Sequence, residues 1–234
     1  MTTDKKALKA MLDAGCHFGH KTSKWNPKMM RYIFTKKDGI HIFDLVKTHE
    51  ALVKAQEFLK DLVSKGKTVL FVSTKLQAIK FVDEAAKRCG CPFITRKWMP
   101  GILTNFDTIK KRIKYFRDLK QQRDSGEWEK YTKKERLELS RVIEKLENAF
   151  SGVEEMLRSP DAVVVLDALH DSLALREAKR LKIPTVAICD SNADPDLVTY
   201  PIPGNDDAIK SLRYFIDSIA SAVEEGKKTI AAKQ

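Results

Sequence analysis

Basic and aromatic side chains in the first half of this 234-residue chain are the groups best suited to chemistry with a partner. Lysine and arginine neutralise phosphates and release counterions, and tryptophan can stack on a base or pack against a sugar. The candidates for binding RNA are Lys21, Lys24, Trp25, Lys28, Arg31, Lys36, Lys37, Arg96, Lys97, Trp98, Lys110, Lys111, Arg112, Lys114 and Arg117. The alternative is a solvated basic surface, which the 13 basic against 9 acidic residues of positions 106–150 do not exclude.

The charge of the chain is unevenly distributed. The formal net charge is +11, yet residues 1–150 carry 33 Lys and Arg against 18 Asp and Glu, and residues 151–234 carry 10 against 14. A basic surface favours an anionic partner, either nucleic acid or an anionic membrane. A membrane role is disfavoured because no apolar run approaches the roughly 18–20 residues needed to cross a bilayer. We therefore expect one preferred basic face.

The segment 14–34, AGCHFGHKTSKWNPKMMRYIF, combines two histidines, one tryptophan and several cations. Its apolar residues follow neither a two-residue nor a 3.6-residue period, so no regular amphipathic element is predicted here. Packing on another part of the protein, or a ligand, must hold it. An RNA-binding loop and an irregular loop wrapped over a core both fit this pattern.

Acidic residues in the C-terminal half raise the question of a metal site. A divalent cation could be held by Asp190, Asp194, Asp196, Asp206 and Asp207, together with His17 or His20. The alternative, which we favour, is that these residues serve as turn and cap residues. Zinc bound by Cys16, Cys89 and Cys91 with the histidines fits poorly, because paired ligand spacings are missing. We predict neither a metal nor a cofactor.

Catalytic signatures are also missing from the sequence. The chain contains no G-x-G-x-x-G, no G-x-x-x-x-G-K-[ST] and no G-x-S-x-G pattern. An enzyme acting on a small-molecule substrate is therefore disfavoured, and a nucleotide- or sugar-phosphate-dependent α/β enzyme is kept as the alternative. The four cysteines show no disulfide framework and the N-terminus no secretory signal, which favours a cytoplasmic protein.

Short apolar runs alternate with helical patterns along most of the chain. Strands are predicted at 68–72, 92–95, 162–166, 184–189 and 200–204, and helices at 4–13, 48–65, 76–89, 172–181 and from 205 or 206 onward. Thr48 is the expected N-cap of the second helix. Strands that are apolar throughout predict a parallel sheet covered on both faces. A separate β-hairpin is predicted from 31–34 and 40–43 around Asp38-Gly39.

Two long helical patterns lie between the strands at 92–95 and 162–166. The first covers 105–124, and a capping box at Thr132 and Glu135 begins the second. The second carries a coiled-coil seam of Leu139, Ile143, Leu146, Phe150, Val153 and Leu157. We predict one discontinuous α/β domain (1–104 and 158–226), a helical hairpin inserted at 105–157 and a flexible tail at 227–234.

Three motifs resemble a known family. The segment 14–34 with DGIHIFDLVKT resembles the N-terminal signature of the bacterial small-subunit ribosomal protein two family, RKWMPGILTNFDTI resembles its mid-chain motif, and IPTVAICDSNADPDLVTYPIPGNDDAIKSL resembles its C-terminal signature. The matches run in order from about residue 10 to residue 225.

The resemblance implies a flavodoxin-like domain with a protruding coiled-coil hairpin, and a structural, non-enzymatic role in the small ribosomal subunit. It also implies contact with small-subunit rRNA and with neighbouring ribosomal proteins, including the mRNA-capturing ribosomal protein one. His17 and Phe18 are then expected to anchor the segment 14–34, while Lys21, Lys24, Lys28 and Arg31 face the partner. Pro100 departs from the family's Trp-Leu-Gly-Gly pattern, which leaves the conformation of that loop open.

Overall fold

A parallel β-sheet forms the centre of the protein, for which a computed structural model describes residues 5–231. Its strand order is β5-β4-β6-β7-β8. The strands are β4 (Val69–Val72), β5 (Phe93–Ile94), β6 (Ala162–Val165), β7 (Thr185–Cys189) and β8 (Tyr200–Pro203). This order places the first two strands of the sheet at one side and adds the later three in sequence, as in flavodoxin-like folds. The predicted α/β fold class is confirmed.

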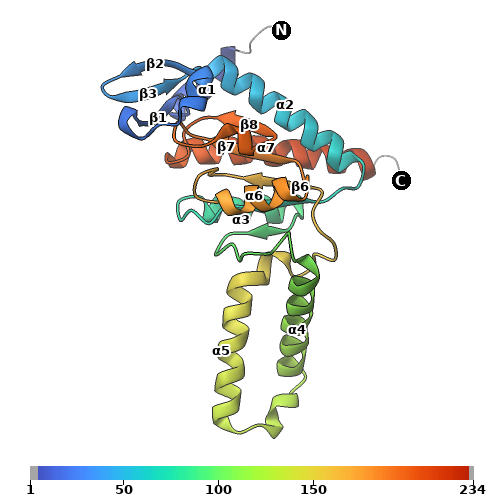
Figure 1. Ribbon diagram of the computed structural model, residues 1–234. Coiled ribbons are helices and arrows are strands. Elements are labelled where there is room, and N and C mark those ends of the chain that lie inside the picture. The colour runs from blue at the N-terminus through green and yellow to red at the C-terminus, as the bar shows by residue number, and fades with distance from the viewer. Residues whose placement is uncertain (1–4, 232–234) are drawn as a thin grey trace.

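Helices cover both faces of this sheet, because alternate residues of each buried strand point to opposite sides. Val69 and Phe71 pack against α2 (Leu45–Ser64), α3 (Ile79–Cys89) and α7 (Ile209–Ala231). Leu70 and Val72 pack on the opposite side with α6 (Ser172–Arg180) and the inner end of the helical hairpin. The short α1 (Lys5–Asp13) lies beside α2 (Figure 1).

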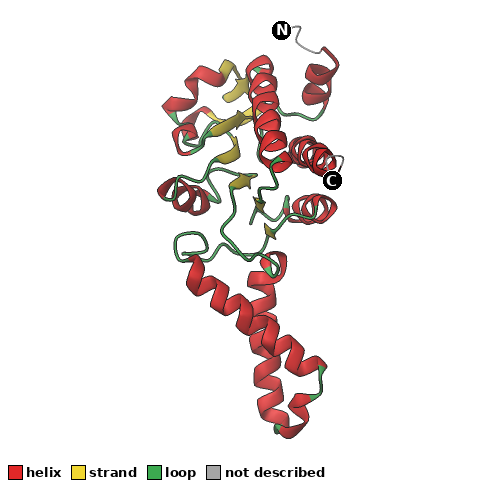
Figure 2. Cartoon of the chain, turned by 90° about the vertical axis from the view of Figure 1, so that its right-hand side faces the viewer, coloured by secondary structure: helices red, strands yellow, loops and turns green. Residues whose placement is uncertain are grey.

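The helical hairpin projects away from the sheet in both views (Figures 1 and 2). It consists of α4 (Phe106–Asp124), η3 (Glu127–Lys130), α5 (Lys133–Phe150) and η4 (Ser151–Val153). The capping box at Thr132 and Glu135 is present. The predicted seam is wrong at its end, because α5 stops at Phe150 and Leu157 is 65% exposed. Supercoiling of the two helices, and the hairpin as a separate domain, stay predictions.

The chain that follows α5 approaches the central sheet closely at the base of the hairpin. A Cβ atom on Gly152 would lie 2.1 Å from the carbonyl oxygen of Phe93 and 2.7 Å from its ring. The chain therefore passes directly against the edge strand β5 at this glycine. Helical periodicity alone could not show that the chain leaves its helix to reach the sheet edge.

A second, antiparallel sheet is built from the N-terminal segment. It contains β1 (Phe18–Lys21), β2 (Ile33–Lys37) and β3 (Ile40–Phe43), in the order β1-β3-β2. The β2–β3 hairpin is confirmed, and both turn residues, Asp38 and Gly39, have positive φ as a type I′ turn requires. The expectation of no regular element before it is wrong, because β1 pairs with β3. The irregular stretch between β1 and β2 contains η1 (Thr22–Lys24) and η2 (Pro27–Tyr32).

Several helix ends differ from their predictions: α3 begins at Ile79 and not at residue 76, and α7 begins at Ile209 and not directly after residue 205 or 206. Asp44, not Thr48, caps α2 by accepting hydrogen bonds from the amides of Val46 and Lys47, while Thr48 is buried within the first turn. The predicted tail from Lys227 is helical as far as Ala231, where α7 ends, and residues 232–234 lie outside the described part. None of the helices between residues 5 and 231 has the length and apolar character of a membrane span.

Candidate nucleic-acid interface

The carboxyl edge of the parallel sheet, where a doubly wound fold binds its ligand, is filled by a lysine and three carboxylates. Lys75 follows β4, and its Nζ lies 3.0 Å from Asp167, 2.9 Å from Asp206 and 2.7 Å from Asp207. Asp167 follows β6, and the two other acids follow β8. The lysine is thus paired inside the fold at the point where the strand order reverses. We find no phosphate-binding glycine loop at this position.

The pKa values of Lys75 and Asp206 in this network are both raised, for different reasons. Burial opposes the charged form of Lys75, but hydrogen bonds to Asp207 and Asp206 and the field of the acids raise its pKa above the ordinary value. Burial raises the pKa of Asp206 to about 7, with neighbouring Asp167 and Asp190 acting in the same direction. The network therefore holds the loops after β4, β6 and β8 together.

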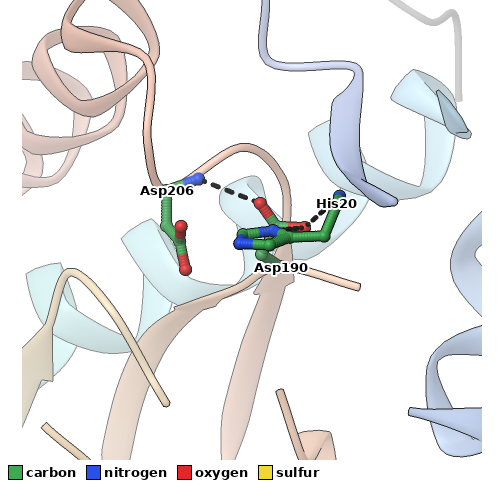
Figure 3. Close-up of side chains that lie close together, drawn as sticks. All are labelled: His20, Asp190 and Asp206. Atoms are coloured by element: carbon green, nitrogen blue, oxygen red, sulfur yellow. Dashed lines mark hydrogen bonds and ion pairs between the residues drawn. The ribbon is translucent and has the colours of Figure 1, made fainter. Parts of the chain in front are cut away.

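His20 joins β1 to this network (Figure 3). Its Nδ1 lies 3.0 Å from Oδ1 of Asp190, and its backbone amide donates to Asp190 and to Oγ of Ser191. The hydrogen bond to Asp190 raises the pKa of His20 to about 9, so the imidazole is charged at neutral pH. Asp190 also accepts a hydrogen bond from the amide of Asp206. These contacts dock the N-terminal sheet on the central domain.

Among the residues considered for a metal ion, His20, Asp190 and Asp206 form one cluster, whereas Asp194 and Asp196 pair with Lys28. Ligand atoms of His20, Asp190 and Asp206 lie within 4.8 Å of one another, which makes them the one such cluster in residues 5–231. Their ligand atoms already have partners, since His20 binds Asp190 and Asp206 binds Lys75. Cys16, Cys89, Cys91 and Cys189 are free and buried. Burial raises the pKa of the Cys16 thiol to about 11, which disfavours the thiolate that zinc requires.

The other two acids pair with predicted RNA-binding cations. Lys28 Nζ lies 2.9 Å from Asp194 and 3.0 Å from Asp196, and Arg31 lies 3.3 Å from Asp196. Asp194 also caps η5 (Pro195–Leu197) by accepting from the amide of Asp196. Both cations remain exposed, but they are bound to the acidic loop of the same chain.

The remaining cations of the N-terminal sheet and of the turn η1 within it are exposed: Lys21, Lys24, Lys36 and Lys37. None of the four makes an ion pair with any residue that the structure describes. Trp25 is half-buried, with its ring 5.1 Å from that of His41 and 5.8 Å from Nζ of Lys36. His41 is fully buried, and burial lowers its pKa. The Trp25 ring is therefore partly packed into the protein.

The two residues expected to anchor this segment, His17 and Phe18, differ in burial. His17 is half-buried, and burial lowers its pKa below the usual value. The ring of Phe18 lies 4.0 Å from that of His17 but remains 46% exposed. Phe34, which sequence reasoning did not single out, is 75% exposed on β2. Its position in a β-prone run beside two lysines was the signal available for it.

Of the three predicted RNA-binding residues in the mid-chain loop 96–105, two are exposed and one is buried. Arg96 and Lys97 are exposed, whereas Trp98 is buried and its Nε1 donates to Oε1 of Glu177 at 3.1 Å. The Trp98 ring is thus part of the core and is not presented to a partner. Pro100 and Gly101 occupy a turn closed by the amide of Ile102 on the carbonyl of Met99, and Gly101 has φ +91°. Proline followed by a glycine with positive φ suits a type II turn.

The helix α4 exposes most of its predicted cations. Lys110, Lys111, Arg112 and Lys114 are exposed and make no ion pair with described residues, whereas the apolar stripe of the helix is buried. Arg117 instead donates to the backbone carbonyl of Glu154 and is partly buried. The structure therefore presents two cationic surfaces, one on the N-terminal sheet and one on α4.

Comparison with known proteins gives consistent matches along the chain. Residues 11–226 match the family model described as ribosomal protein S2. The chain is 47% identical over 220 residues to small ribosomal subunit protein uS2 of Dictyoglomus thermophilum, covering 94% of this chain and 89% of that protein. It is 45% identical over 222 residues to small ribosomal subunit protein uS2c of Cyanophora paradoxa, covering 95% of each. The identity to uS2 of Nocardia farcinica is 48%, over 94% of this chain and 77% of that protein.

Proposed function

Since this chain belongs to the ribosomal protein S2 family, it is a structural component of the small ribosomal subunit and not an enzyme, and we propose that it binds small-subunit rRNA through two surfaces. The sheet surface comprises Lys21, Lys24, Lys36 and Lys37, and the helix surface comprises Lys110, Lys111, Arg112 and Lys114. Arg96 and Lys97 add exposed charge on the mid-chain loop. The alternative of a nucleotide- or sugar-phosphate-dependent enzyme does not agree with this family.

The observation that carries the proposal is that these eight cations are exposed and form no ion pair with an acidic residue among residues 5–231. Lys28, Lys75 and Lys120, by contrast, each form an ion pair with acidic residues of the chain. A cation without a protein partner can neutralise a phosphate with little loss of existing contacts. Trp98 and Arg117 are not included, because both are engaged inside the protein.

The test measures binding of the purified chain to small-subunit rRNA as a function of salt. We expect a log–log slope of about −0.7 to −0.9 per phosphate contacted. Reversing Lys110, Lys111, Arg112 and Lys114 to glutamate should lower affinity and flatten the slope without changing the unfolding transition. A charge-matched control reverses four exposed cations of α5, namely Lys133, Lys134, Arg141 and Lys145. Binding that is independent of salt would exclude the electrostatic mechanism.

We also propose that neighbouring small-subunit ribosomal proteins contact this chain, including the mRNA-capturing ribosomal protein one. The support is the family and the long hairpin, which leaves large surfaces of α4 and α5 exposed (Figure 1). Co-sedimentation of tagged chain with small subunits, followed by stepwise salt extraction, checks assembly. Loss of ribosomal protein one from subunits that carry Glu127→Lys and Glu129→Lys, both exposed at the hairpin tip, would support a contact there, and full retention would exclude it.

A further inference from the structure

A third cationic surface lies on α6, within residues 151–234, which carry 10 basic against 14 acidic residues. The helix covers the opposite face of the central sheet from α7 (Figure 1). Its apolar residues Ala174, Leu175 and Ala178 are buried in that face. Positions 172–182 contain a single acid and four cations, all of them exposed: Arg176, Lys179, Arg180 and Lys182. The negative charge of this part of the chain therefore conceals a basic helix face.

The acid of this segment does not neutralise its neighbours. Glu177 is 7% exposed, and its carboxylate accepts hydrogen bonds from Trp98 and from backbone amides of the loop 101–104. A carboxylate that is turned inward cannot serve as the i,i+3 partner of a cation on the helix surface. Three cations of the segment form no ion pair and no side-chain hydrogen bond with residues 5–231: Arg176, Arg180 and Lys182.

Two exposed acids lie beside this surface, and neither pairs with those three cations. The carboxylate of Asp196 binds Lys28 and Arg31, and its backbone carbonyl accepts from Lys179 at a hollow of about 270 Å³. Asp107, which lines a second hollow at the end of α6, belongs to the first turn of α4, where the helix dipole favours a negative charge. An anion that bound the outer face of α6 would therefore break no existing ion pair.

The backbone conformation of Lys182 points to the same surface. The helix ends in a Schellman motif, in which the amide of Ile183 donates to the carbonyl of Ala178 and the amide of Lys182 to that of Lys179. Lys182 occupies the left-handed position of this motif, with φ +57°, where glycine is favoured because a Cβ atom is strained. Among residues 5–231 the other non-glycine residue with positive φ is Asp38, in a turn that accepts aspartate. A lysine at a position that favours glycine indicates a role for its side chain.

We propose that the outer face of α6 and the turn after it form a third contact surface for rRNA, which binds the phosphate backbone through Arg176, Arg180 and Lys182. The two arginines lie about one turn apart, roughly 6 Å along the helix axis, so they can reach different phosphates of one strand. This inference rests on the proposed function and adds a surface to it.

The composition of the surface also indicates how it recognises RNA. Positions 172–185 contain no aromatic residue, so we expect contacts to phosphates that are independent of base sequence. A neighbouring ribosomal protein is the competing occupant. Protein interfaces are depleted of charge at their centre and enriched in aromatic residues, whereas this surface has unpaired cations and no ring. These features favour a polyanion.

Substitutions of Lys182 separate the charge of its side chain from the strain of its backbone. Lys182→Gly removes both, Lys182→Ala removes the charge alone, and Lys182→Arg keeps both. Binding to small-subunit rRNA between about 50 and 200 mM salt should give a log–log slope flattened by about 0.7–0.9 in the first two variants and unchanged in the third. The midpoint of thermal unfolding should rise by roughly 1–4 °C in Lys182→Gly and not in Lys182→Ala. Damage to the fold cannot explain weaker RNA binding by a more stable variant.

A double variant tests the helix itself. Arg176→Gln combined with Arg180→Gln should flatten the slope by about 1.4–1.8. The matched control is Lys54→Gln combined with Lys80→Gln. These two exposed lysines lie on α2 and α3, which cover the other face of the sheet, and neither pairs with a described residue. The slope of the control should equal that of the wild type.

A tethered cleavage reagent locates the contact in assembled small subunits. The four natural cysteines are buried, so a thiol introduced at Leu181→Cys, where the side chain is 43% exposed, can carry an iron chelate selectively. Hydroxyl radicals from this position should cut the rRNA backbone nearby. The same chelate on Lys54→Cys should not cut those sites. Absence of cleavage from Leu181→Cys would contradict the proposed surface.

The outcomes separate this inference from the function on which it rests. If wild-type protein binds rRNA and the variants of Lys182, Arg176 and Arg180 keep its salt slope, the third surface is wrong while the proposed function stands. If the slope is kept but small subunits that carry the double variant lack a neighbouring ribosomal protein, the face binds protein and the inference is also overturned. Absence of wild-type binding to rRNA would contradict the proposed function itself.

Discussion

The indole Nε1 of Trp98 donates to the carboxylate of Glu177 at 3.1 Å, and this bond is one of five that converge on the same buried acid. The backbone amides of Gly101, Leu103 and Thr104 donate to it, as does the Thr104 hydroxyl. Burial favours the neutral acid, yet these donors lower the pKa of Glu177 below its usual value. Glu177 on α6 therefore fixes the loop from which the helical hairpin starts.

Glu177→Gln should destabilise the protein, because one carboxylate oxygen becomes an NH2 group facing amides that already donate. The expected loss is about 2–3 kcal/mol in free energy of unfolding, measured by urea denaturation. Glu177→Asp, which keeps the charge on a shorter side chain, should lose less. A Glu177→Gln variant as stable as the wild type would show that the five bonds contribute little.

Gly152→Ala should disturb the base of the hairpin. The added methyl group would overlap the Phe93 carbonyl, and β5 or the chain after α5 must move. We expect a destabilisation of about 3 kcal/mol, at the upper end for overpacking. Ser151→Ala, at the neighbouring exposed position, is the control and should unfold like the wild type.

The stability of the protein should depend on the protonation of His20. Its pKa is raised to about 9 in the folded state from an ordinary value near 6.5. A raised pKa means that the folded state holds the proton more tightly, so the stabilisation is present below pH 6.5 and lost as the pH rises through about 9.

Measured between pH 7.5 and 9.5, where Asp206 with its pKa of about 7 is mostly ionised, the wild type should lose on the order of 2 kcal/mol. The groups facing the imidazole are Asp190, Asp206 and Asp207, with Lys75 beside them. His20→Gln should flatten the profile in this window. An unchanged slope in the variant would assign the pH dependence to another group.

Removing the acid that pairs with Lys28 and Arg31 should strengthen RNA binding. In Asp196→Asn both cations lose an ion-pair partner, although Lys28 keeps Asp194, and more positive charge is available to phosphates. We expect a gain of roughly two- to fivefold in rRNA affinity at low salt, decreasing as salt is added. Asp217→Asn is the charge-matched control, because Asp217 pairs with Arg88 and Arg213, outside both proposed surfaces. A loss of affinity in Asp196→Asn would show that the loop itself contacts RNA.

Periodic features of the chain were predictable because their physical cause is local. Continuous apolar runs such as residues 162–166 and 184–189 identify strands buried on both faces. The Asp38-Gly39 turn and the Thr132–Glu135 capping box depend on backbone conformation over a few residues. The excess of cations over acids in the first 150 residues likewise follows from composition.

Contacts between distant segments were decided by the tertiary structure. The indole of Trp98 is of a type that can stack on RNA bases. Its hydrogen bond to Glu177, 79 positions away, instead holds it in the core. Lys28 forms ion pairs with acidic residues 166 and more positions away. The four residues of β1 show no two-residue hydrophobic period because a bulge interrupts the strand. The sequence by itself determined the α/β fold and the anionic character of the partner. The tertiary structure decided which cations and rings remain exposed, because contacts between distant residues cannot be predicted from a local sequence pattern.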